Sequence, residues 1–120
     1  MNLHDAKRIH MVGIKGQGMT ALAEILQRRG ISISGSDVGE VFSTDTVLKE
    51  LGIQMHAFDP GNIGGDIEII IYSSAYKPDH PEIATALACG IPCLPYAQAL
   101  AEIFNASKGI VGTVNTQLSD

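Results

Sequence analysis

The sequence contains no tryptophan, and only 5% of its 120 residues are aromatic. Aromatic side chains are the platforms on which single-stranded nucleic acids stack, so this composition argues against such a partner. Basic residues are also scarce, because 8 Lys and Arg stand against 13 Asp and Glu, a net charge of -5. A duplex binder needs a basic face. We therefore expect no nucleic-acid partner, and an anionic ligand would be held mainly by backbone dipoles.

Long hydrophobic runs are missing as well. The N-terminus is polar, and the apolar run that follows it ends at Lys15. This pattern predicts neither a signal peptide nor a membrane span, and hence a cytoplasmic protein without a membrane partner. The only cysteines, Cys89 and Cys93, are not spaced like a usual zinc site. We expect two reduced, partly buried thiols and no metal site.

Short apolar segments alternate with amphipathic ones along most of the chain, and 45% of the residues are hydrophobic. We expect strands over 8–13, 31–35, 53–56, 67–72, 91–94 and 108–112. We expect helices from Met19 to Gly30 and over 44–51, 81–88 and 96–104. The unbroken apolar run 67–72 indicates a central strand covered on both faces. The fold class is therefore α/β, a doubly wound Rossmann-like three-layer sandwich with a mainly parallel sheet.

A glycine cluster joins the first expected strand to the first expected helix. Gly13, Gly16 and Gly18 would let backbone N–H groups and the helix dipole face a phosphate or diphosphate, although a tight turn without a ligand remains an alternative. The dinucleotide fingerprint requires glycine at the position that Lys15 occupies, which argues against an NAD-dependent oxidoreductase. Lys15 would either add a positive charge near the phosphates or point to solvent.

Other polar residues follow the expected strands, at the edge where ligands of such sheets bind. Asp37 could accept hydrogen bonds from ribose hydroxyls, or could cap the loop after its strand. His56 could donate to a phosphate or ribose oxygen, or be structural. Ser73 and Ser74 could line a pocket, or satisfy backbone groups at a strand end. The remaining histidines show no metal spacing, and no residue is expected to be catalytic.

Five stretches together resemble the Mur ligases. They are IHMVGIKGQGMTALA at 9–23, SGSD at 34–37, LGI at 51–53, YSSAYKPDHPE at 72–82 and GIP at 90–92. The resemblance implies a three-domain, ATP- and Mg²⁺-dependent ligase that joins L-alanine to UDP-N-acetylmuramate. Its role would be in peptidoglycan synthesis, and so in cell wall biogenesis, cell shape and cell division. This chain would be the N-terminal domain, and its partners would be UDP-N-acetylmuramate or UDP and the missing central ATPase and C-terminal domains.

The resemblance also implies site residues. The backbone N–H groups of Gly16, Gln17, Gly18 and Met19 would cradle the diphosphate. Lys15 would lie close by. Ser36 and Asp37 would contact the ribose or uracil. A uridine pocket would be lined by Ser73, Ser74 and Ala75, with His56 beside them.

The resemblance ends where the family has an ATP loop of the form G-T-x-G-K-T-T. Gly112 and Thr113 fit this loop, but Asn115 and Thr116 replace its second glycine and its lysine. We expect a UDP-binding domain over 1–112, a divergent or truncated tail over 113–120, and no complete ATP site. As a fragment the chain would hold no cofactor and would be inactive alone. The alternatives are a stand-alone nucleotide-binding or sensing module, and the corresponding domain of a muropeptide-recycling ligase.

Overall fold

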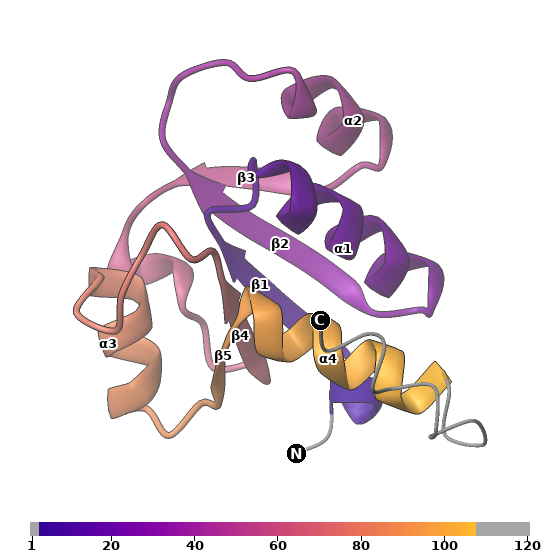
Figure 1. Cartoon of the computed structure of the whole chain (residues 1–120). Coiled ribbons are helices and arrows are strands. Elements are labelled where there is room, and N and C mark those ends of the chain that lie inside the picture. The colour runs from indigo at the N-terminus through magenta and orange to yellow at the C-terminus, as the bar shows by residue number, and fades with distance from the viewer. Residues whose placement is uncertain (1–2, 108–120) are drawn as a thin grey trace.

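The computed structural model of the chain describes residues 3–107 (Figure 1). The strands are β1 (Arg8–Val12), β2 (Ser32–Asp37), β3 (Gln54–Ala57), β4 (Ile69–Tyr72) and β5 (Cys93–Pro95). The helices are α1 (Gln17–Arg28), α2 (Thr44–Glu50), α3 (Pro81–Ala88) and α4 (Tyr96–Ser107), with short 3-10 turns η1 (Leu3–Asp5) and η2 (Pro60–Asn62). The strand expected over 108–112, the ATP-loop remnant Gly112-Thr113 and the tail lie outside the described residues.

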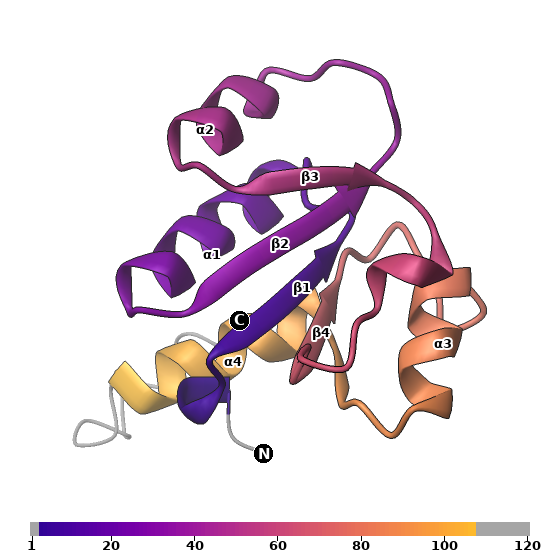
Figure 2. The same ribbon diagram turned by 180° about the vertical axis from the view of Figure 1, so that it is seen from behind.

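The five strands form one sheet in the order β3-β2-β1-β4-β5, and every neighbouring pair is parallel. One face is covered by α1, α2 and α4, whose buried side chains share a core with Ile9, Met11 and Ile71. The other face carries α3 and the segment before β4, around Val12 and Ile70. Figures 1 and 2 show α1 and α4 together on one side of the sheet. The expected α/β architecture is confirmed.

The apolar run before Tyr72 behaves as expected, because Ile69, Ile70 and Ile71 are all fully buried. Ile69 and Ile71 face the α1 side and Ile70 faces α3, so both faces of β4 are covered. The central position among the described strands nevertheless belongs to β1, which pairs with both β2 and β4. Among the described strands, the expectation that the fourth strand is the central one was wrong. An unbroken apolar run shows only that both faces of a strand are covered, and a strand next to the central one meets that condition as well.

Most elements begin or end one to three residues away from the expected bounds, and two of these differences concern the candidate site. Helix α1 starts at Gln17 rather than at Met19, because the Gly16 carbonyl already accepts a hydrogen bond from the Thr20 N–H (2.8 Å). Strand β2 continues to Asp37, because its last residues pair with His56 and Ala57 of β3. Both extensions bring predicted site residues into regular elements, which fixes their backbone positions.

The second helical layer covers only part of the sheet. On the face that α3 shares, the β2–β3 half presents polar residues, and Ser32, Gln54 and His56 are exposed there. The three-layer sandwich is therefore complete only over β1, β4 and β5 within residues 3–107.

Among the helices of residues 3–107, none is both long enough and apolar enough to cross a membrane.

Candidate functional site

The carboxyl ends of β1 and β4 meet where the crossover connections change direction, which is the usual ligand position in such sheets. The N–H groups of Gly13 and Ile14 both donate to the Ser36 carbonyl (2.9 and 3.2 Å), so the glycine loop is fastened to the end of β2. Gly13 has a φ of 81°, and a Cβ there would lie 2.8 Å from both the Ser73 Cβ and the Tyr76 ring. Glycine thus lets the loop after β1 touch the loop after β4.

The first turn of α1 offers backbone donors to a ligand. Gly16 is its N-cap, with no side-chain cap hydrogen bond. The Gly16 N–H donates to the Gly13 carbonyl (3.3 Å) and so serves the loop itself. Of the four N–H groups expected at a diphosphate, those of Gln17, Gly18 and Met19 are left at the start of the helix. Such donors, at the positive end of the helix dipole, suit an anion.

Tyr96, the first residue of α4, lies against this turn. A Cβ on Gly18 would meet the Tyr96 hydroxyl oxygen at 2.6 Å and its ring Cζ at 2.8 Å. Tyr96 was not among the expected site residues. Its position directly after β5, at the ligand-binding edge, was the available signal.

Asp37 is buried and fixes the start of the glycine loop. Its Oδ2 accepts a hydrogen bond from the Lys15 N–H (2.8 Å), and its Oδ1 accepts one from the Val38 N–H (2.7 Å). The structure therefore supports the capping role that was one of the two alternatives. Each carboxylate oxygen can accept a further bond, so contact with a ribose hydroxyl is compatible with this geometry.

Of the two alternatives for Lys15, the one in which its side chain points to solvent is wrong. Its ammonium is buried and lies 2.6 Å from the Glu40 carbonyl, 3.2 Å from Asp45 Oδ2 and 5.6 Å from the centroid of the Phe42 ring. A desolvated ammonium needs partners, and the segment after β2 supplies them. Lys15 is therefore directed at the segment after β2 rather than at solvent.

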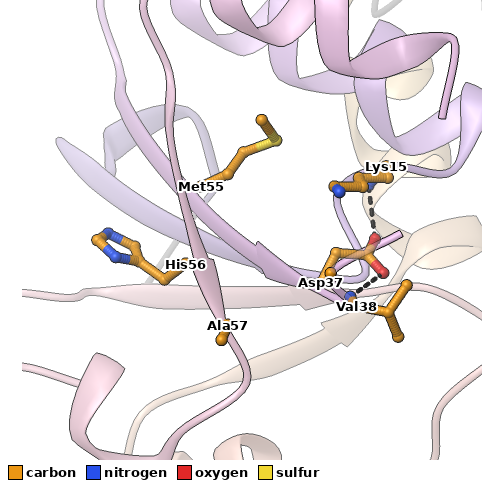
Figure 3. Close-up of a pocket in the computed structure, with 7 residues that line it drawn as sticks. Lys15, Asp37, Val38, Met55, His56 and Ala57 are labelled. Carbon is orange, nitrogen blue, oxygen red and sulfur yellow. Dashed lines mark hydrogen bonds between the residues drawn. The ribbon is translucent and has the colours of Figure 1, made fainter. Parts of the chain in front are cut away.

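A hollow of ≈ 240 Å³ opens beside these residues, between the carboxyl ends of β2 and β3 (Figure 3). It is lined by Lys15, Asp37, Val38, Gly39, Met55, His56 and Ala57. Three expected site residues, Lys15, Asp37 and His56, are thus brought together, with His56 exposed at the rim. Figure 3 shows the Met55 and His56 side chains leaving β3 in different directions.

The serine residues are placed differently from one another. Ser73 Oγ accepts a hydrogen bond from the Ala75 N–H (3.2 Å), and Ser74 and Ala75 are exposed in the loop after β4, outside the lining of the hollow. The Ser36 side chain is fully buried, and its hydroxyl donates to Glu82 Oε1 (2.7 Å). Ser36 thus meets the glycine loop through its carbonyl and faces α3 with its side chain.

Ser36 belongs to a buried polar network that was not expected from the sequence. His10 Nε2 donates to Glu82 Oε1 (2.8 Å), and His10 Nδ1 lies 2.9 Å from Ser34 Oγ. Glu82 Oε2 accepts hydrogen bonds from the Asp59 N–H (2.8 Å) and the Asn62 amide (2.9 Å). The network ties β1, β2 and α3 to the loop after β3. Its only sequence signal is a histidine inside an apolar strand.

Burial of Glu82 opposes its ionisation and would raise its pKa. The hydrogen bonds from His10, Ser36, the Asp59 N–H and Asn62 outweigh burial, so the pKa falls from 4.5 to about 2.

The two cysteines lie outside this network. Burial raises the pKa of the half-buried Cys93 thiol, whereas Cys89 is exposed rather than partly buried as expected. Both thiols are free. Within residues 3–107 no three His, Cys, Asp or Glu side chains are grouped to hold a metal ion.

Comparison with known proteins gives concordant matches. The family model described as "Mur ligase family, catalytic domain" matches residues 8–108. The UDP-N-acetylmuramate–L-alanine ligase of Treponema pallidum is 47% identical over 109 residues, and that of Aquifex aeolicus is 42% identical over 105. These matches cover 88% and 87% of this chain. The chain spans about a quarter of the curated relatives' length, 23% in both cases.

Solved structures agree with these matches. The UDP-N-acetylmuramate–alanine ligase from Thermotoga maritima superposes with a TM-score of 0.76 at 28% identity, over 84% of this chain and 23% of the other. A UDP-N-acetylmuramate:L-alanyl-gamma-D-glutamyl-meso-diaminopimelate ligase from Neisseria meningitides gives 0.72 at 28% identity, over 81% and 31%. Because the family model covers most of the chain, the chain belongs to the Mur ligase family.

Proposed function

We propose that this chain is the UDP-N-acetylmuramate-binding domain of a ligase that joins L-alanine to this nucleotide in peptidoglycan synthesis. The observation that carries the proposal is the juxtaposition of two subsites. The first turn of α1 presents the N–H groups of Gln17, Gly18 and Met19, and the hollow beside Asp37 begins at the same glycine loop, through Lys15. One subsite suits a diphosphate and the other a nucleoside.

The geometry suggests how the ligand would be held. The three N–H groups would contact the diphosphate, with the Gly16 N–H closing the turn beneath them. Asp37 would use its remaining acceptor capacity for the ribose, and His56 would donate from the rim. Ser73, Ser74 and Ala75 would flank the nucleotide from the loop after β4. Ser36 would act through its carbonyl, because its side chain faces Glu82.

The whole protein's reaction is part of the same proposal. Curated relatives named UDP-N-acetylmuramate–L-alanine ligase are about four times longer than the matched segment. We infer that ATP and Mg²⁺ bind to the missing domains of a cytoplasmic parent enzyme, whose product serves cell wall growth and division. The 120-residue chain would bind its nucleotide without ligating it. Incubation with ATP, Mg²⁺ and L-alanine should therefore release no phosphate.

Calorimetric titration tests the binding proposal. UDP-N-acetylmuramate and UDP should bind saturably, whereas NADH and ATP should not. Asp37→Asn should weaken UDP binding by about 1 kcal/mol. The amide NH₂ of the variant would face one of the two N–H groups that donate to Asp37, and the side chain would no longer offer a charged acceptor to the ribose. Asp66→Asn is the matched control, since Asp66 is exposed and pairs with Arg8 at the other end of the strands. NADH binding without a response to UDP compounds would contradict the proposal.

A second candidate is supported by the similarity to the Neisseria ligase, whose name specifies a tripeptide substrate. A recycling ligase would take the same UDP-N-acetylmuramate, so the domain described here fits both activities. The two are separated in the full-length parent enzyme. ADP release that depends on L-alanine supports the first, and release that depends only on L-alanyl-γ-D-glutamyl-meso-diaminopimelate supports the second.

A further inference from the structure

We propose that Lys15 is a positioning residue that fastens the segment 38–45 over the nucleoside hollow, rather than a charge that neutralises the diphosphate. This inference rests on the proposed function. Lys15 belongs to the glycine loop, and its side chain reaches across to the connection between β2 and α2. Figure 3 shows the Lys15 side chain beside Asp37 at the wall of the hollow.

Lys15 contacts this connection through both its side chain and its backbone. The ammonium donates to the Glu40 carbonyl and pairs with Asp45, and it lies over the Phe42 ring. The Lys15 carbonyl accepts a hydrogen bond from Thr44 Oγ1 (2.6 Å). Asp45 in turn accepts one from the Phe42 N–H (3.1 Å). The contacts of Lys15 therefore span the connection from Glu40 to the first turn of α2.

Apart from its contacts with Lys15, the connection is held by the Val38 N–H bond to Asp37 and by the turn that Phe42 and Asp45 form with each other. Residues 38–43 belong to no helix or strand, and the Val41 side chain is 83% exposed. Yet Val38 and Gly39 form one wall of the hollow. Because few apolar contacts give a segment little local stability, loss of the Lys15 contacts should let this wall move. The Lys15 side chain is only 7% exposed, and the charged and polar partners of its ammonium, Asp45 and the Glu40 carbonyl, hold it at this segment, which argues against a direct role at the diphosphate.

The test uses the full 120-residue chain and two ligands, UDP and uridine, because uridine carries no phosphate. NMR titration measures the millimolar affinities expected for uridine. Lys15→Met keeps the length of the side chain and removes its charge and donors. If Lys15 positions the wall, affinity for both ligands should fall by the same factor, about tenfold. Lys49→Met, an equal charge change at an exposed position of α2, should leave both affinities unchanged.

Asp45→Asn provides an independent variant, because it loosens the partner and leaves the glycine loop unaltered. It should lower uridine affinity in the same direction. If Lys15 instead served the phosphates, releasing it from Asp45 would leave UDP binding unchanged or strengthen it. Loss of UDP binding in Lys15→Met with uridine affinity intact would overturn the inference. So would a wild-type chain that binds UDP but shows no saturable uridine binding.

Hydrogen exchange tests the fastening without any ligand. In Lys15→Met, amides in 38–45 should exchange at least about tenfold faster than in the wild type, while those of α3 stay protected. Unchanged exchange in 38–45 would overturn the inference. A wild-type chain that binds neither nucleotide, but whose segment 38–45 is released by Lys15→Met, would contradict the proposed function instead. The two failures are therefore distinguishable.

Discussion

At the residue scale, Glu82 is a fully buried carboxylate that stays ionised because four donors surround it. Its Oε1 accepts hydrogen bonds from His10 and Ser36, and its Oε2 accepts them from the Asp59 N–H and Asn62. Hydrogen bonds of this number offset the free-energy cost of burying a carboxylate. Removal of one partner leaves part of that cost uncompensated and lowers the free energy of unfolding. The network therefore contributes to the free energy of unfolding in a pH-dependent way.

Glu82→Gln should lower the free energy of unfolding at pH 7 by about 2 kcal/mol, because the amide NH₂ would face donors rather than accept from them. The folded-state pKa lies below 4.5, so Glu82 stabilises the wild type fully above about pH 4.5. This contribution is lost as the pH falls towards about 2. Urea unfolding at pH 7 and pH 3 should show a smaller pH dependence in the variant.

The control is Glu50→Gln, at an exposed position of α2. Its effect should stay within about 0.5 kcal/mol at either pH. Equal pH dependence in the wild type and Glu82→Gln would show that Glu82 does not carry the acid sensitivity.

Individual residues were the hardest part to predict. Asp37 and His56 were expected at the site because strand ends meet at one edge of a parallel sheet, and both line the hollow. The His10–Glu82 pair was missed because its members lie 72 residues apart and meet only after α3 packs on the sheet. The partners of the Lys15 ammonium were missed for a related reason, since Glu40 lies in a connection without regular structure and Asp45 lies 30 residues away in the first turn of α2.

At the element scale, apolar periodicity and glycines sufficed to predict the strands and helices of residues 3–107. Gly30, Gly52 and Gly90 follow α1, α2 and α3 with φ of 89°, 73° and 78°, the left-handed conformation that ends a helix. The start of α1 was misplaced because Gly18 sits inside its first turn. A glycine at this helical position is explained by the close approach of Tyr96 in α4, which no local sequence pattern indicates.

Gly18→Ala should lower the free energy of unfolding by about 1–2 kcal/mol, because the new Cβ would meet the Tyr96 hydroxyl and ring. In a Tyr96→Leu background the same change should be neutral or slightly stabilising, since alanine favours a helix over glycine. Thermal or urea unfolding of the wild type, the two single variants and the double variant measures the interaction energy between the two positions. Gly65→Ala, where nothing lies within 4 Å of the added Cβ, is the control. Equal costs in both backgrounds would contradict this contact.

At the scale of the whole molecule, the two proposed subsites belong to different parts of the sheet. The hollow lies at the ends of β2 and β3, and the helix turn follows β1. A ligand that bridges them would bind only the folded chain. Ligand binding should therefore stabilise the molecule as a whole rather than one element.

UDP-N-acetylmuramate at a hundred times its Kd should raise the free energy of unfolding by about 2.7 kcal/mol. For a domain of this size that corresponds to a rise in Tm of roughly 10 °C or more. Differential scanning calorimetry over a ligand series measures it, with AMP as the matched nucleotide control. Equal stabilisation by AMP would indicate a general anion effect at α1.

The pairing of β1 with β4 also has a consequence for the order of folding. Ile9 pairs with Ile69, and the Arg8 N–H reaches Glu68 across 60 positions of the chain. The β1-α1-β2 unit can form from nearer neighbours, whereas β4 must close a long loop before it docks. The contact of Gly13 with Ser73 and Tyr76 exists only after that closure. A nucleotide that needs this edge would therefore slow unfolding and leave the folding rate nearly unchanged.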